Sequence, residues 1–290
     1  MEHSRVAERE RTRHSPSGEA GLREVTLTLL GTGTSAGVPL IGCDCATCTS
    51  DDPRDRRLRT AAALRYTDAR GMHRTVLLDV GPDHRQQALQ HRIDRADYIL
   101  LTHSHVDHVW GLDEVRRYNA LMGTSIPVIG DARTLDELRR IYAHIFDRAR
   151  NANESWVADL ATVRIAPGES LDCHGIRATA VQMLHGRLPI LAWRFDGPSP
   201  LFPLVYATDV NGIPPESWRH LVGTRTLILD GLRFRSHPTH FSVDQAVETA
   251  SRIGAIRTVL VHMTHDILHE RDAQRLPDGV EFGFDGLALR

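Results

Sequence analysis

Six short apolar runs that each end in an aspartate or a histidine place the strongest constraint on how this chain can fold. After an earlier strand at 25–30, they recur from Thr60 onward as TVLLDVG, DYILLTHSH, TAVQMLH, PLVYATD, RTLILDG and RTVLVHMTH. Such runs, bounded by glycine or proline, are typical of buried strands in sheets covered on both faces. Scattered histidines would rarely put a metal-binding side chain at the end of every strand. We therefore predict that these polar ends gather along one edge of the sheets.

Amphipathic stretches between the runs predict helices that cover the sheets. The clearest are 112–121, 134–149 and 242–253, and Ser242 has the residue type and position of an N-cap for the last. No repeat or linker divides the chain, so residues 22–290 are predicted to form one α/β-layered domain. Residues 1–21 are charged and lack an apolar core. They predict a disordered leader rather than a signal peptide.

Composition excludes several classes of function. The chain has 290 residues, and 35 basic side chains against 37 acidic ones give a net charge of -2. This balance argues against a surface that coats nucleic acid. No apolar stretch reaches the roughly 18 residues of a membrane span. All the basic residues are arginine, which excludes a Walker A lysine and a Schiff-base lysine.

The segment HSHVDH carries the strongest chemical signal. In an extended turn, His103 and His105 lie on the same side of the chain. The chain then turns into a helix, which presents Asp107 and His108 in another direction. One segment can therefore serve two neighbouring ions, and neutral imidazole with carboxylate suits Zn, Mn or Fe. A second ion needs further ligands, and Asp209, His185 and His262 are available at strand ends.

Three of the four cysteines lie within the six-residue segment CDCATC. Cysteines this close constrain almost nothing as disulfides, so a reduced, metal-binding knuckle in a cytoplasmic protein is the better interpretation. Cys43, Cys45 and Cys48 supply three thiolates, whereas tetrahedral zinc takes four ligands. Cys173 is isolated, and we interpret it as a structural thiol.

HSHVDH resembles the HxHxDH signature of the metallo-β-lactamase fold superfamily. The segments GTGTSAGVP, CDCATC, DPRDRRLRT, LDVGPDHRQQ, THSHVDHVWGLDEVRRYN and VHMTHD resemble one branch, the PhnP-like cyclic-phosphate phosphodiesterases, which are relatives of tRNase Z. The resemblance extends over nearly the whole chain. It implies an α+β fold with a four-layer αββα sandwich, a dinuclear metal site and a homodimer.

The resemblance also implies which side chains hold the metals. One ion would be held by three histidines, namely His103, His105 and His185. The second would be held by Asp107, His108 and His262, with Asp209 bridging the two ions. Zn or Mn is expected at both positions. Asp79 matches the family's early strand-end aspartate and would orient a histidine ligand from behind. By the same resemblance, His265 completes a structural zinc site with Cys43, Cys45 and Cys48.

Catalytic roles beyond metal binding fall on Asp107 and His240. His240, in HPTHFSVDQA, resembles the histidine that this branch places beside the scissile phosphate, where it could stabilise charge or protonate the leaving oxygen. The neighbouring His237 is interpreted as an ordinary loop residue. Arg57 and Arg59 could contact a substrate phosphate, or could belong to a solvated charge run.

These observations predict metal-dependent hydrolysis of a small cyclic phosphate diester resembling phosphoribosyl 1,2-cyclic phosphate. Two alternatives stay open. Thioesterases and lactonases of the same fold use the same core on carbonyl substrates, and a tRNase Z-like nuclease would act on RNA. The near-neutral charge and the lack of a basic, glycine-rich arm make nucleic acid the less favoured partner.

Overall fold

A computed structural model describes residues 21–147 and 156–290, so the predicted leader, apart from Gly21, lies outside the described residues. The described chain forms two seven-stranded sheets. The first has the order β14-β1-β2-β3-β4-β5-β6, with β1 (Arg23–Gly31), β2 (Ala61–Thr67), β3 (His73–Leu78), β4 (Tyr98–Leu100), β5 (Ile126–Gly130), β6 (Leu160–Arg164) and β14 (Ala288–Leu289). The second has the order β13-β12-β11-β10-β9-β8-β7, with β7 (Ser170–Cys173), β8 (Ile176–His185), β9 (Leu188–Asp196), β10 (Leu204–Ala207), β11 (Thr226–Asp230), β12 (Arg257–Val261) and β13 (Val280–Phe282).

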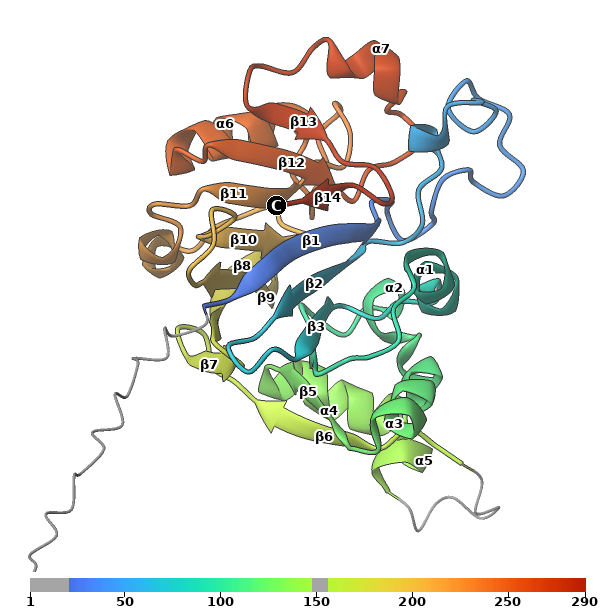
Figure 1. Ribbon diagram of the computed structural model, residues 1–290. Coiled ribbons are helices and arrows are strands. Elements are labelled where there is room, and N and C mark those ends of the chain that lie inside the picture. The colour runs from blue at the N-terminus through green and yellow to red at the C-terminus, as the bar shows by residue number, and fades with distance from the viewer. Residues whose placement is uncertain (1–20, 148–155) are drawn as a thin grey trace, which may run out of the picture.

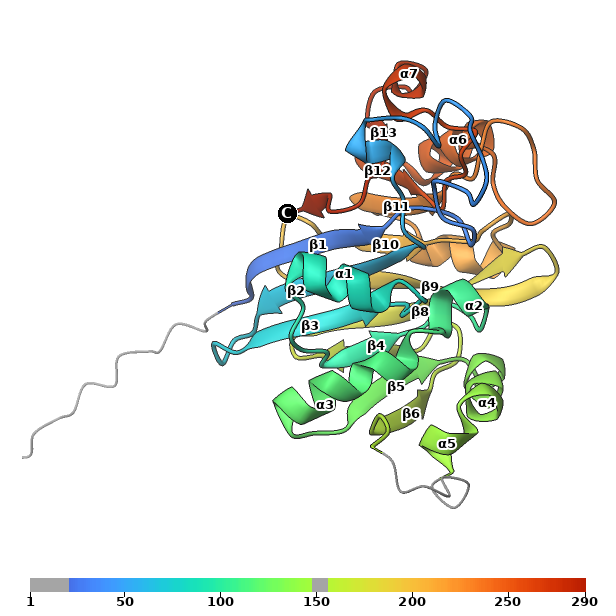
Figure 2. The same ribbon diagram turned by 90° about the vertical axis from the view of Figure 1, so that its right-hand side faces the viewer.

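Helices cover the outer face of each sheet (Figures 1 and 2). The first sheet carries α1 (His84–His91), α2 (Val106–Val109), α3 (Arg116–Met122), α4 (Ala132–Ile141) and α5 (Ala143–Phe146). The second carries α6 (Val243–Ile253) and α7 (His269–Ala273), and short 3-10 helices lie at Pro53–Asp55, Leu112–Val115 and Pro215–His220. None of the helices in 21–147 or 156–290 is long and apolar enough to cross a bilayer.

Three apolar cores separate the four layers. One fills the space between the two sheets, around residues such as Leu27, Trp193 and Tyr206. A second lies between the first sheet and its helices, and a third lies under α6. Because both faces of the central strands are covered, these strands are apolar on both sides, as the continuous runs predicted. The predicted αββα sandwich is confirmed.

The predicted elements recur with adjusted boundaries. All six apolar runs contain strands, namely β3, β4, β8, β10, β11 and β12. The stretch 112–121 divides into a 3-10 turn and α3, and the stretch 134–149 divides at Tyr142 into α4 and α5. Residues 148 and 149 lie outside the described residues. Ser242 caps α6 as predicted: its hydroxyl accepts the Gln245 N–H, and the Gln245 side chain accepts the Ser242 N–H.

Strand direction brings the polar ends together. Strands β3, β4, β5 and β6 run parallel, as do β10, β11, β12 and β13. Three residues just beyond these strands, Asp79, Asp209 and His262, adopt left-handed backbone conformations with φ of 59°, 59° and 61°. This conformation costs a non-glycine residue on the order of 1–3 kcal/mol and tends to cluster at functional sites. The left-handed residues therefore lie together at the edge where the strands end, which indicates a functional site there.

A pair of glycines seats the HSHVDH segment against the first sheet. A Cβ on Gly81 would lie 2.0 Å from the carbonyl oxygen of Asp107, and a Cβ on Gly111 would lie 2.2 Å from the carbonyl oxygen of Gly81. The backbone of α2 therefore touches the β3–α1 loop directly. Only glycine permits this approach.

Candidate metal centre

Seven aspartate and histidine side chains converge where the strands end, and we call them the sheet-edge cluster. They are His103, His105, Asp107, His108, His185, Asp209 and His262. All seven were predicted as ligands from the sequence, and they divide into two adjacent groups.

The first group consists of three imidazoles. The ligand atoms of His103, His105 and His185 all lie within 4.8 Å of one another. The ring centroids of His103 and His105 are 4.4 Å apart. His103 is buried and its Nε2 has no hydrogen-bond partner, whereas His105 reaches solvent. The group therefore forms one open-sided set of nitrogen donors.

The second group combines two carboxylates and two imidazoles, with ligand atoms again within 4.8 Å of one another. Nε2 of His108 lies 3.3 Å from Oδ2 of Asp107 and 3.3 Å from Oδ2 of Asp209. Nε2 of His262 lies 3.2 Å from Oδ1 of Asp209. The two oxygens of Asp209 thus face different histidines. The ring centroid of His108 also lies 4.3 Å from that of His103 of the first group, with the two rings tilted at 44°.

The electrostatics of these side chains fit a bound cation. Burial alone would raise the pKa of Asp209, but the imidazoles of His262 and His108 hold that pKa well below its usual value. Burial lowers the pKa of His103 well below its ordinary range, so this imidazole is neutral and able to bind metal. Both ring nitrogens of His262 and Nε2 of His108 are sealed from solvent without a hydrogen bond. Buried polar atoms normally have partners, and a nitrogen and oxygen donor set of this kind suits Zn, Mn or Fe.

Hydrogen bonds from behind orient these ligands. Asp79 is fully buried, and its carboxylate accepts the Nδ1–H of His108 at 2.8 Å together with the N–H and hydroxyl of Thr102. Nδ1 of His185 donates to the carbonyl oxygen of Thr239 at 2.8 Å. In both histidines the Nδ1 contact leaves Nε2 for the cluster, which is how metal-binding histidines are commonly held. Asp79 lies where the sequence predicted it.

His240 lies beside both groups. Its ring centroid is 4.6 Å from that of His185 and 4.8 Å from that of His262, with the latter ring stacked at 12°. Burial, and then the nearby imidazole of His262, lower the pKa of His240 to about 4. The predicted catalytic histidine therefore faces the space where the two groups meet.

Asp230 is a partner of His240 that the sequence reasoning left without a role. Its Oδ2 lies 2.6 Å from Nδ1 of His240 and accepts the Val210 N–H at 2.8 Å. The carboxylate is fully buried, and burial raises its pKa well above the usual value. Asp230 ends its apolar run in the same way as the predicted ligands, and this position in the sequence could have identified it as a site residue. Its role depends on the loop that returns His240 to the end of β11.

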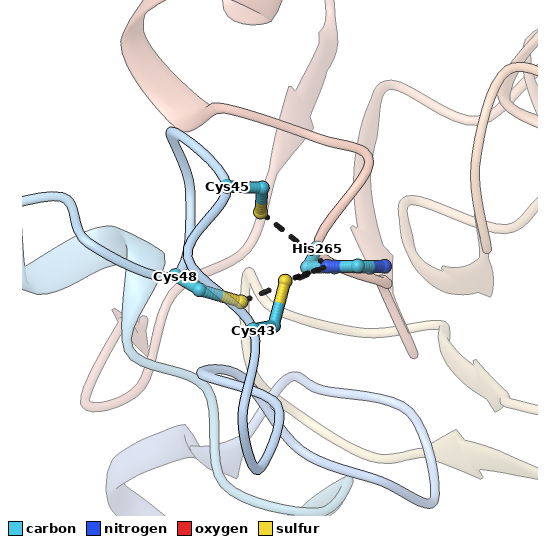
Figure 3. A group of neighbouring side chains, drawn as sticks. All are labelled: Cys43, Cys45, Cys48 and His265. Atoms are coloured by element: carbon cyan, nitrogen blue, oxygen red, sulfur yellow. Dashed lines mark hydrogen bonds between the residues drawn. The ribbon is translucent and has the colours of Figure 1, made fainter.

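A second set of ligands, the knuckle cluster, lies where the loop between β1 and β2 meets the segment after β12. It consists of Cys43, Cys45, Cys48 and His265, from segments far apart in the chain (Figure 3). The three Sγ atoms lie 3.3, 3.4 and 3.6 Å from Nδ1 of His265. Zinc bond lengths of about 2.3 Å to sulfur and 2.0–2.1 Å to nitrogen give a tetrahedron with a sulfur–nitrogen edge of about 3.5 Å. The arrangement therefore fits one zinc ion.

The structure corrects the expectation for Arg57. Its side chain has no exposed surface and pairs with Asp55 at 2.8 Å. The remaining guanidinium hydrogens bond the carbonyl oxygens of Thr264 and Ile267 at 2.9 Å each. Each of its three guanidinium nitrogens donates within the protein and the side chain is fully buried, so Arg57 cannot meet a substrate phosphate. It instead fastens the knuckle loop to the segment that follows His262.

Arg59 is also engaged by the protein, although less completely. Its guanidinium pairs with Asp83 at 2.9 Å and donates to the carbonyl oxygen of Ser35 at 3.2 Å, while a third of the side chain stays exposed. These contacts hold the glycine-rich turn after β1, and the arrangement does not single out Arg59 as a phosphate ligand.

Comparisons with known proteins agree with this architecture. The family model described as "Beta-lactamase superfamily domain" matches residues 74–263. An octanoyltransferase of Porphyromonas gingivalis (strain ATCC BAA-308 / W83) is 35% identical over 261 residues, which is 89% of this chain and 50% of that protein. The chain thus spans half the length of this curated relative.

Two solved structures extend the comparison. The crystal structure of a new diphosphatase from the PhnP family is 37% identical, with a TM-score of 0.82 over 92% of this chain and 97% of that chain. Zn²⁺-bound PqqB from Methylobacterium extorquens is 19% identical, with a TM-score of 0.71 over 91% of this chain and 99% of that one, and shares the fold. Because the family model covers more than half of the chain and the diphosphatase is similar over nearly its full length, this chain belongs to the metallo-β-lactamase fold superfamily, within its PhnP-like branch.

Proposed function

We propose that the chain is a metal-dependent phosphodiesterase that hydrolyses a small cyclic phosphate diester resembling phosphoribosyl 1,2-cyclic phosphate. The observation that carries this proposal is the pair of adjacent ligand groups with the His240–Asp230 pair beside them. Two adjacent cation sites suit a phosphate diester, because negative charge has to be neutralised both at the attacked phosphorus and at the leaving oxygen.

In this proposal His103, His105 and His185 would hold one divalent ion, Zn or Mn. Asp107, His108 and His262 would hold the other, and Asp209 would serve both. Bound ions of this kind lower the pKa of water and neutralise the oxygens of a phosphoryl group. The protein fixes the ligands from behind, through Asp79 on His108 and Thr239 on His185. The knuckle cluster holds one further, structural zinc. The homodimer implied by the family resemblance stays a prediction.

His240 acts on the leaving oxygen. Its Nδ1 is engaged by Asp230, so Nε2 is the ring atom left to face substrate. The buried pair retains a proton readily, since burial favours a shared proton over a bare carboxylate. The pair then carries two protons, one on Nε2 of His240 and one shared between its Nδ1 and Asp230. When the bond to phosphorus breaks, Nε2 gives its proton to the departing oxygen, and the shared proton stays on Nδ1, hydrogen-bonded to the Asp230 carboxylate.

The charge around His240 favours an anionic substrate. Arg233 lies on the same loop, and its nearest carboxylate oxygen, on Asp266, is 3.9 Å away. Its hydrogen bonds go to the carbonyl oxygens of Arg235 and Ser236, at 3.3 and 3.5 Å. Arg233 and Arg235 line a cavity of about 280 Å³ between this loop and the knuckle loop. Asp266 lines the same cavity, but its ion pair with Arg233 is long, so the guanidinium could exchange this partner for a phosphate.

Acyl chemistry is the second candidate, because the Porphyromonas relative is named an octanoyltransferase. Half of that relative has no counterpart in this chain, so its name does not by itself assign acyl transfer to the shared half. The PhnP-family diphosphatase, which matches over nearly its whole length, supports phosphorus chemistry instead.

Hydrolysis of bis(p-nitrophenyl) phosphate, compared with a p-nitrophenyl acyl ester, tests the proposal. The purified protein is assayed with added Mn²⁺ or Zn²⁺, beside His240→Ala and the matched control His237→Ala. We expect diester cleavage, a loss of about 10²–10⁴-fold in His240→Ala, and less than about threefold change in His237→Ala. Cleavage of the acyl ester alone would establish the carbonyl alternative and remove the assigned role of His240.

A further inference from the structure

The Asn211 side chain bridges two loops that carry different parts of the proposed site. Its Oδ1 accepts the backbone N–H of Gly186 at 2.7 Å, and its Nδ2 donates to the carbonyl oxygen of Pro238 at 2.8 Å. Gly186 follows His185 in the β8–β9 turn. Pro238 lies two residues before His240. One amide group therefore joins the His185 turn to the His240 loop.

Only an amide side chain satisfies both contacts at this length. One neighbour is an N–H and the other is a carbonyl oxygen, so the orientation of the amide is fixed by its surroundings. Aspartate could accept from Gly186, but it would place a second oxygen against the carbonyl of Pro238. A shorter hydroxyl could not reach both backbones. The two contacts therefore require an amide at position 211, which the half-buried location of the side chain alone would not.

The surrounding backbone reinforces the same junction. Asn211 N–H donates to the Leu184 carbonyl, and Leu184 N–H donates to the Gly212 carbonyl, at 2.9 Å each. A Cβ on Gly186 would lie 2.8 Å from Cγ2 of Thr239, so the turn packs directly on the loop. His185 adds its own bond to the Thr239 carbonyl. The two loops therefore meet along a continuous seam with Asn211 across it.

The seam sets the distance between two functional rings. His185 belongs to the first group of the sheet-edge cluster, and its centroid lies 4.6 Å from that of His240. Asn211 also comes two residues after Asp209, and the intervening Val210 N–H bonds Asp230. A shift at Asn211 would therefore move His185, His240 and the partner of His240 relative to one another.

We propose that Asn211 is a positioning residue that fixes the His185 turn relative to the His240 loop. The hydrogen bonds of its side chain go to backbone atoms of these two loops. Its effect on turnover rests on the proposed function, because His240 must reach the leaving oxygen of a substrate held by the sheet-edge cluster. A displacement of about 1 Å in such a site can cost on the order of 10²-fold in rate.

The chain offers a matched control for the decisive variant. Asn119 also bridges two backbone segments, donating to the carbonyls of Thr124 and Asp159 and accepting the Asp159 N–H, all at 2.9 Å. It lies in α3, which contributes no residue to the site. Asn211→Asp and Asn119→Asp therefore make the same chemical change in the same kind of bridge. Both proteins are prepared with Zn²⁺ and checked for folding by circular dichroism.

Two readouts are compared. For bis(p-nitrophenyl) phosphate, Asn211→Asp is expected to lower kcat about 10–100-fold with KM within about threefold, while Asn119→Asp stays within about twofold of the original protein. In histidine side-chain ¹H–¹⁵N spectra, assigned with His185→Gln and His240→Ala, the His185 and His240 signals should move in Asn211→Asp and stay in place in Asn119→Asp. A merely structural bridge would leave these two ring signals unmoved.

The outcomes separate this proposal from the proposed function. If Asn211→Asp matches Asn119→Asp in both readouts, the positioning role is wrong. If Asn211→Asp does not fold, Asn211→Ala decides, since it removes the bridge without adding repulsion; unchanged ring signals and kcat in that variant also overturn the role. If the original protein does not cleave the diester, the proposed function fails, and the ring signals alone decide whether Asn211 positions the two histidines.

Discussion

The two candidate metal groups of this protein are built in opposite ways. The sheet-edge cluster takes its side chains from the ends of strands in both sheets, and all but two of them, His105 and His185, are buried. The knuckle cluster takes three of its four ligands from one loop of irregular chain between β1 and β2. All three of these cysteines are partly exposed. One group is positioned by sheet register, the other by a loop that folds back on itself.

This difference indicates what each group needs from a metal. In the sheet-edge cluster the ladder hydrogen bonds, the glycine contacts at α2 and the Asp79 bridge hold the ligands whether or not an ion is bound. The knuckle ligands instead sit on irregular chain, which the Arg57–Asp55 pair and the backbone hydrogen bonds between Val38 and Arg57 fasten at its base. Changes at the sheet edge should therefore remove chemistry and spare stability, and changes at the knuckle should do the reverse.

The largest effect is expected from Asp209→Asn. The amide keeps the volume of the carboxylate but removes the charge that faces both His108 and His262, so kcat for the diester should fall by about 10³-fold or more, or roughly 4 kcal/mol in barrier. The melting temperature should change little, because the two imidazoles that face Asp209 can lose their protons once the carboxylate charge is removed. Asp244→Asn, an exposed position on α6, should leave both quantities unchanged. Full turnover in Asp209→Asn would show that the sheet-edge cluster is not the reaction centre.

The sequence predicted the sheet-edge cluster better than it predicted the knuckle's support, for a physical reason. Because parallel strands share an edge, the apolar runs predict that the residues at their ends gather there, and the HSHVDH motif with the family resemblance then assigns the ligands. Arg57 instead reads as part of an exposed arginine-rich run. Its burial depends on carbonyl oxygens of Thr264 and Ile267, which lie more than two hundred positions away, and no local pattern encodes that contact.

The same limit explains Asp230 and the divided helices. Asp230 ends its run like a ligand, but its partner is set by the loop that returns His240 to β11. The stretches 112–121 and 134–149 keep one apolar face throughout, so periodicity reads each as a single helix. The structure divides the first stretch between Val115 and Arg116 and the second at Tyr142. Local pattern gives the element and its buried face, whereas tertiary packing decides where it breaks.

Loss of a knuckle ligand should give the next largest effect. In Cys45→Ser the hydroxyl is a poor zinc ligand, so the protein should lose one bound zinc and its melting temperature should fall by roughly 5–10 °C, equivalent to about 3 kcal/mol. Diester kcat at 25 °C should change less than about threefold. Metal content by atomic emission and thermal unfolding provide the measurements.

Cys173→Ala is the control for thiol removal, because Cys173 is buried in the core between the sheets and far from the knuckle in sequence. It should keep its zinc content. A knuckle variant that retained all its zinc, or that lost turnover before stability, would break the division of roles between the two groups.

Asp79→Asn should have an intermediate effect confined to the sheet edge. The amide can still accept the Thr102 N–H, but it no longer offers a charged acceptor to Nδ1 of His108. Removing such a partner typically costs 10–100-fold in metal affinity. Competition with a chelator should therefore strip the ions of the sheet edge at about 10–100-fold lower chelator concentration, with the knuckle zinc retained. Equal loss from both groups would mean that Asp79 supports the fold rather than the ligand.

The smallest effect is expected from Arg233→Ala, at the cavity where the two regions adjoin. Arg233 lies on the His240 loop, while Leu40 and His265 bring the knuckle to the same cavity. With no carboxylate closer than 3.9 Å, its charge is available to a phosphate group of the substrate remote from the reaction. Arg233→Ala should raise KM about 3–10-fold for a cyclic ribose phosphate that bears a second phosphate, and little for the same compound without it; the difference should shrink at high salt. Arg133→Ala, on the exposed surface of α4, should leave both KM values unchanged.

An equal rise in KM for both substrates would place Arg233 at the reacting phosphate. No rise for either substrate would mean that the knuckle side of the site contributes to stability and does not contribute to substrate recognition.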